Sequence, residues 1–143
     1  MNAPHVIRIR GPWKRCVLND VRNPATATVK IPSSWKLDLG DDFEGRVVYE
    51  RFFNRPTNLD ANSQVRLTFK EIVGNAAVEL NGIELGQVRW PDGTASFDVS
   101  EKLLSRNQIV VEIESLKRSN SENASHSLPP EGGITGDVQL EID

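Results

Sequence analysis

Two polar segments of the chain carry side chains that could recognise a ligand rich in hydroxyl groups. Carboxylates, amides and guanidinium groups suit such a ligand, because together they offer acceptors and oriented donors. The candidate ligand-binding residues are Asp41 and Asp42 in residues 36–44, and Arg118, Asn120, Glu122 and His126 in residues 115–133. The alternative interpretation is that these are solvated side chains of ordinary surface loops.

A third candidate is an aromatic side chain in a turn. Trp90 lies in the sequence RWPDG (residues 89–93), where proline and glycine predict a chain reversal. An exposed indole there could stack on the apolar face of a sugar ring or on a partner protein, whereas the alternative is that it folds back onto the core. Trp13 and Trp35 are expected to be structural.

The sequence predicts neither a catalytic group nor a resident cofactor. It contains no G-x-S-x-G nucleophile motif and no glycine-rich phosphate loop, and His5 and His126 have no neighbour at zinc-ligand spacing. Asp38, Asp41, Asp42 and Glu44 carry the oxygen ligands that Ca²⁺ prefers, but no EF-hand loop is present. We therefore predict no bound metal, with a structural calcium ion as the alternative.

The elements that must position these loops are β-strands. Residues 65–86 alternate apolar and polar side chains around Asn81-Gly82, a pair that supplies the positive φ angles of a tight hairpin turn. Further strands are expected at 6–10, 13–19, 26–31 (an edge strand between prolines), 46–53, 94–99, 108–114 and 137–142. One short helical turn is expected at 101–105, capped by Asp98.

Strand 46–53 has apolar residues on both faces, which predicts that both faces are covered. Cys16, the one cysteine, is expected to be a buried thiol. The first half of the chain is richer in Lys and Arg and the second half in Asp and Glu. This asymmetry predicts that Arg8 and Arg10 pair across strands with Glu141 and Asp143.

Composition places the chain among ordinary globular proteins. Its 143 residues fit a single domain, residues 1–143, and its net charge of −3 argues against broad nucleic-acid binding. The sequence has no apolar run long enough for a membrane span and no secretory signal at its start. The expected location is the cytoplasm for this sequence as it stands, or outside the cell if it is part of a longer exported chain.

About eight short strands with almost no helix predict an all-β, antiparallel β-sandwich of the jelly-roll type. Five phrases in order resemble the N-terminal sugar-binding domain of family 2 glycoside hydrolases, which has a galactose-binding-domain-like jelly roll. They are IPSSW (31–35), FEGRVVYERFF (43–53), VRLTFKEIVGNAAVELNGIELG (65–86), FDVSEKLLSRNQIVVEI (97–113) and GGITGDVQLEI (132–142).

The resemblance implies a domain without chemistry of its own, because the catalytic carboxylates of those hydrolases lie on a separate barrel. It also implies that loops 36–44 and 115–133 are the ones that approach the sugar. The sequence therefore predicts a non-catalytic carbohydrate-binding module. The alternative is an accessory module that docks on a hydrolase or another protein without binding sugar.

Overall fold

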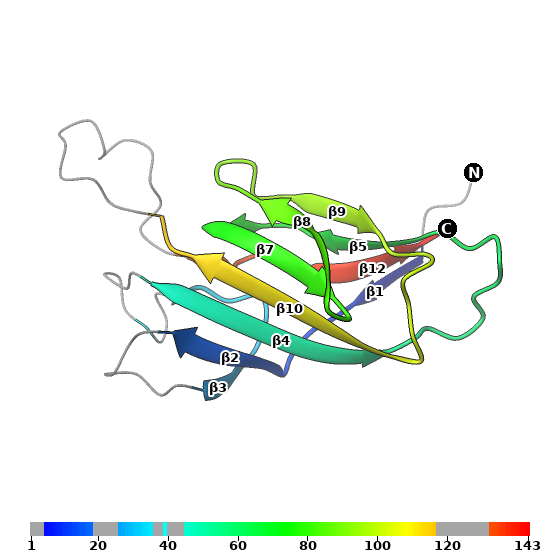
Figure 1. The fold of residues 1–143 in the computed structure, drawn as a ribbon, viewed down its shortest axis with the longest axis horizontal. Helices are drawn as coiled ribbons and strands as arrows, with labels where there is room; N and C mark the ends of the chain where they lie inside the picture. Colours follow the sequence, from blue (N-terminus) through cyan, green and yellow to red (C-terminus); the bar gives the residue numbers. More distant parts are fainter. Residues whose placement is uncertain (1–4, 19–25, 36–38, 40–44, 117–131) are drawn as a thin grey trace.

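The computed structural model describes residues 5–18, 26–35, 39, 45–116 and 132–143. They form two layered antiparallel β-sheets and a small third sheet, and the described residues contain no α-helix (Figure 1). The expected antiparallel β-sandwich is thus confirmed. The strands are β1 (His5–Arg8), β2 (Trp13–Leu18), β3 (Thr26–Val29), β4 (Arg46–Asn54), β5 (Val65–Phe69), β6 (Ile72–Val73), β7 (Asn75–Leu80), β8 (Ile83–Val88), β9 (Ala95–Asp98), β10 (Arg106–Glu114), β11 (Gly133–Ile134) and β12 (Val138–Ile142).

The larger sheet has six strands in the order β3-β2-β4-β10-β7-β8, and the smaller has four in the order β1-β12-β5-β9. The core lies between these two sheets. It is built from the inward side chains of each strand, such as Val111 and Ile113 of β10 and Leu140 of β12, all at most 1% exposed. The apolar residues of 108–114 therefore face the core, as their alternation predicted.

The Asn81-Gly82 turn is confirmed as the tip of the hairpin that joins β7 and β8. Asn81 and Gly82 have φ angles of 54° and 82°, and Leu80 pairs with Ile83. The first strand of residues 65–86, which is β5, is not part of this hairpin. It pairs with β12 and β9 in the smaller sheet. The small third sheet was not expected: it pairs β6, between β5 and β7 in sequence, with β11, which precedes the last strand.

The predicted helix at 101–105 is wrong. Asp98 does accept the backbone N–H of Ser100 at 2.9 Å, but the chain then makes a single turn, with Lys102 N donating to Val99 O at 2.9 Å. The next strand begins at Arg106, which leaves too few residues for a helix.

Two burial predictions are also wrong. Strand β2 buries Trp13, Arg15 and Val17, so the alternation directs the Cys16 side chain to the outer face of the six-stranded sheet, where it is half-buried. On the same outer face, Phe52 of β4 is 38% exposed, with the Arg106 guanidinium 4.9 Å from its ring centroid. Strand β4 is therefore packed on its inner face only.

The two chain ends pair as expected, since β1 and β12 are antiparallel neighbours, but the ion pairs differ. Arg8 contacts Asp137 at 3.5 Å. Glu141 and Asp143 instead contact Arg66 of β5, at 3.6 and 3.0 Å. The expected pairing of Arg8 and Arg10 with these two carboxylates is wrong because β5 lies directly beside β12 on the other side.

Candidate functional site

The bases of the two predicted ligand-binding loops lie together at one end of the sandwich, which we call the loop end. Ser115 N donates to Gly45 O at 2.9 Å, and Gly45 N donates to the Ser115 hydroxyl at 2.9 Å. At the other attachment, Trp35 N donates to Gly132 O at 2.8 Å. Each end of segment 36–44 is thus joined to an end of segment 117–131.

Trp35 makes this joint rigid. Its side chain is 3% exposed, and its Nε1–H donates to the Tyr49 hydroxyl at 2.8 Å. Gly132 and Gly133 pack against the indole so closely that a Cβ on Gly132 would lie 2.6 Å from the ring. Trp35 and Trp13, which is fully buried with its Nε1–H bonded to Ile9 O at 3.2 Å, are therefore structural, as expected.

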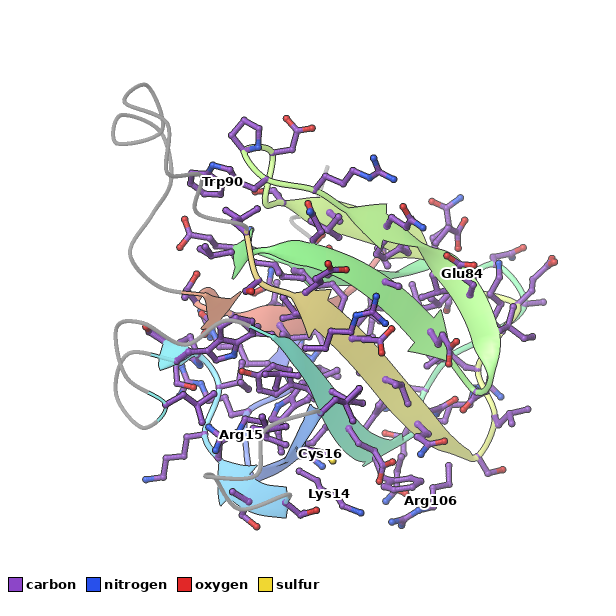
Figure 2. The ribbon with its side chains drawn as sticks, turned by 60° about the vertical axis from the view of Figure 1, so that its left-hand side comes forward. Lys14, Arg15, Cys16, Glu84, Trp90 and Arg106 are labelled. Carbon is purple, nitrogen blue, oxygen red and sulfur yellow. The ribbon has the colours of Figure 1, made fainter. Side chains whose placement is uncertain are left out.

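Trp90 belongs to the same end. Its turn is closed by Asp92 N donating to Arg89 O at 2.9 Å, and Gly93 O accepts the N–H of Ile72 at 2.7 Å. Ile72 pairs with Ile134 of β11, next to Gly133, which packs against Trp35. The Trp90 side chain is half-buried. Figure 2 shows it on the side of the molecule away from Glu84 and Arg106.

The other predicted site residues, Asp41, Asp42, Arg118, Asn120, Glu122 and His126, lie outside the described residues. So do Asp38 and Glu44 of the calcium alternative. Within the described ranges, no three His, Cys, Asp or Glu side chains come close enough to hold a metal ion. The structure therefore brings together Trp90 and the bases of both loops.

A polar pocket that the sequence did not predict adjoins this end, on the outer face of the six-stranded sheet. Its volume is about 370 Å³. We call it the outer-face pocket, and its polar lining consists of Arg46, Asn75, Gln87, Arg89, Glu112 and Glu114. The alternation of residues 108–114 could have predicted that Glu112 and Glu114 lie on this face. It could not have predicted that residues of β7 and β8 complete the pocket lining.

Two pairs of side chains frame the outer-face pocket. Arg46 contacts Glu114 at 3.5 Å, and Arg89 Nη2 donates to Gln87 Oε1 at 3.0 Å. Glu112 and Asn75 form no side-chain hydrogen bond or ion pair with any residue in the described ranges. The pocket therefore holds acceptors and donors that have no partner among the described residues, between two hydrogen-bonded or ion-paired walls.

A larger hollow of about 810 Å³ lies at the opposite end, between residues 55–64 and the turn after β9. Two of its carboxylates, Asp60 and Asp98, are already engaged locally. Asp60 accepts the N–H of Asn62 at 2.8 Å, and Asp98 accepts the Ser100 hydroxyl at 2.7 Å. The bonds from the Ser100 hydroxyl and from Ser100 N hold the pKa of Asp98 below its ordinary value. The loop end is therefore the stronger candidate site.

The fold agrees with the family comparison. Residues 26–140 match the family model described as glycosyl hydrolase 2 galactose-binding domain-like. The chain belongs to this family. No curated protein matches it.

Solved structures with the same fold are parts of much longer chains. The FMN-binding β-glucuronidase from Facaelibacterium prausnitzii L2-6 superposes with a TM-score of 0.82 at 20% identity, over 99% of this chain and 23% of that one. The β-glucuronidases of Bifidobacterium dentium and Ruminococcus gnavus give TM-scores of 0.76 and 0.77, at 22% and 20% identity. Each match covers 99% of this chain, and 30% and 28% of theirs. This chain thus spans less than a third of each relative.

Proposed function

We propose that this chain is a non-catalytic carbohydrate-binding domain whose ligand lies at the loop end. The observation that carries the proposal is the hydrogen-bonded joint between the bases of loops 36–44 and 115–133. It holds together the bases of two segments whose sequences are rich in carboxylates, amides and Arg, at the same end as the half-buried Trp90 and the outer-face pocket. Asp41, Asp42, Arg118, Asn120, Glu122 and His126 supply hydroxyl recognition in this proposal, and Trp90 supplies the stacking face.

The carboxylates of the outer-face pocket support a binding role rather than hydrolysis. Glu112 and Glu114 are two residues apart on one strand, so they lie on the same wall, about 7 Å from each other. Glycoside hydrolysis requires two carboxyl groups that flank the scissile bond from different sides. Glu114 is in addition paired with Arg46. Glu112 and Glu114 therefore lie on one side of a ligand in the pocket, where they orient it rather than flank its glycosidic bond.

The test is a calorimetric screen of the purified chain against galactosides, glucuronides, mannosides and polysaccharide fragments. Trp90→Ala should weaken saturable binding about fivefold, since an aromatic stacking contact is worth about 1 kcal/mol. Arg118→Ala tests the long loop. Phe52→Ala is the matched control, because Phe52 is an exposed aromatic away from the loop end and its loss should leave affinity unchanged.

No binding across the whole panel would contradict the proposal and favour the protein-docking alternative. The large exposed apolar side chains among the described residues do not by themselves support docking. Val6, Phe52, Ile83 and Leu104 lie on four different segments, and single exposed apolar residues are normal.

A further inference from the structure

The outer-face pocket exists because of one small residue. Ala77 of β7 lies directly opposite Glu112 of β10 on one side and Gln87 of β8 on the other. Side chains at such positions have Cβ atoms about 5 Å apart, so a methyl group between two long side chains leaves a hollow. Ala77 is only partly buried, which places it on the floor of that hollow rather than in the core.

The polar side chains around this floor that have no partner among the described residues suit the neighbouring hydroxyl groups of a sugar. Each sugar hydroxyl donates one hydrogen bond and accepts others. The Glu112 carboxylate is an acceptor without a partner among the described residues, and the Asn75 amide offers both a donor and an acceptor. Arg89 uses Nη2 to bond Gln87, and this bond orients its remaining N–H groups as donors.

We propose that the outer-face pocket binds one uncharged sugar unit, and that Trp90 stacks on the next unit of the same oligosaccharide. This inference rests on the proposed carbohydrate-binding function. Trp90 follows Arg89 directly, so its Cα lies about 3.8 Å from that of a residue that lines the pocket. A volume of about 370 Å³ is near the lower limit of ligand pockets, ~300–1,000 Å³, which limits the pocket to a single unit.

The charges of the pocket select a neutral ring. Arg46 and Arg89 balance Glu112 and Glu114, and the Arg46 charge is engaged by Glu114 at 3.5 Å. A uronic acid gains no net attraction from such a lining and brings its carboxylate close to that of Glu112. Neutral galactosides, glucosides or mannosides therefore bind in preference to glucuronides.

The experiment is a titration of the ¹⁵N-labelled chain, followed by NMR, with lactose, cellobiose and mannobiose, and with glucuronic acid as the charged probe. Ala77→Gln fills the floor of the pocket and should abolish disaccharide binding. Glu112→Gln keeps the size but removes the charge, and should weaken binding about tenfold. Both side chains lie on the outer face, so both variants should keep the melting temperature of the wild type.

Glu79→Gln is the matched control. Glu79 lies on the same face of β7, opposite Glu84 and outside the pocket lining, so its change should leave affinity intact. Sugar binding that depends on Trp90 but not on Ala77 or Glu112 would overturn this inference while the proposed function stands. A preference for glucuronic acid over the neutral disaccharides would have the same consequence. Absence of binding in this titration and in the wider screen would overturn both.

Discussion

Replacing Gly132 with Ala tests whether the joint at the loop end is as rigid as its geometry indicates. The added Cβ would lie 2.6 Å from Cε3 and Cζ3 of Trp35. Real Cβ atoms do not approach ring carbons this closely, so one of the two must move. The indole cannot rotate freely, because it is buried and its Nε1–H is bonded to the Tyr49 hydroxyl.

The expected loss of stability has two parts. Overpacking a filled core costs about 1–3 kcal/mol. If the indole shifts, the buried hydrogen bond to Tyr49 is lost as well, which costs about 0.5–1.5 kcal/mol more. The total of about 1.5–4.5 kcal/mol corresponds to a fall in melting temperature of roughly 5–13 °C for a chain of this size.

The assay is thermal and urea unfolding of Gly132→Ala, monitored by circular dichroism and by tryptophan fluorescence. Gly82→Ala is the matched control, because a Cβ at Gly82 would have no atom within 4 Å but its φ angle is 82°. That variant should lose only about 1 kcal/mol, the cost of a left-handed backbone for alanine. The reasoning would be refuted if Gly132→Ala were no less stable than Gly82→Ala and kept the wild-type fluorescence.

Two further predictions concern buried polar groups. Asn107, fully buried, bonds Leu104 N and O and the amide of Asn81, so Asn107→Ala should lower the free energy of urea unfolding by about 2–4 kcal/mol, and an unchanged midpoint would contradict this. The pKa of Glu141 is held below its ordinary value of 4.5, mainly by the hydrogen bond from Gln139 and also by those of Thr68 and the charges of Lys70 and Arg66. This stabilisation is present above pH 4.5 and is lost as the pH falls through the lower folded-state pKa. The stability difference between wild type and Glu141→Gln should therefore shrink between pH 7 and pH 3, and an equal difference at both would refute it.

Local chemistry explains which parts of the fold the sequence predicted. Asn81-Gly82 specifies its turn through its own backbone preferences, and the alternation of residues 108–114 specifies an inner face, so both predictions are confirmed. The alternation that begins at Trp13 predicts an outward Cys16, whereas the usual burial of a thiol and exposure of arginine predict the opposite. The structure follows the alternation, with Arg15 buried and Cys16 on the outer face.

Features that depend on pairing between distant strands could not be predicted. The partner of Arg66 is decided by β5 lying beside β12, and the sequence near Arg66 contains no sign of that neighbour. The outer-face pocket likewise requires the register that sets Ala77 between Glu112 and Gln87. Of the predicted ligand-binding residues, Trp90 alone lies in the described part of the chain, at the end that the resemblance indicated.

The pairing of β1 with β12 has a practical consequence for handling the protein. His5 lies opposite Ile142, and Figure 1 shows the start of β1 and the end of β12 on the side remote from the bases of the two loops. An affinity tag, a fluorescent label or a surface tether attached beyond β1 or β12 therefore starts on the side away from the loop end. Because β1 and β12 are neighbouring strands, a linker could also join the ends of the chain in a circular permutant.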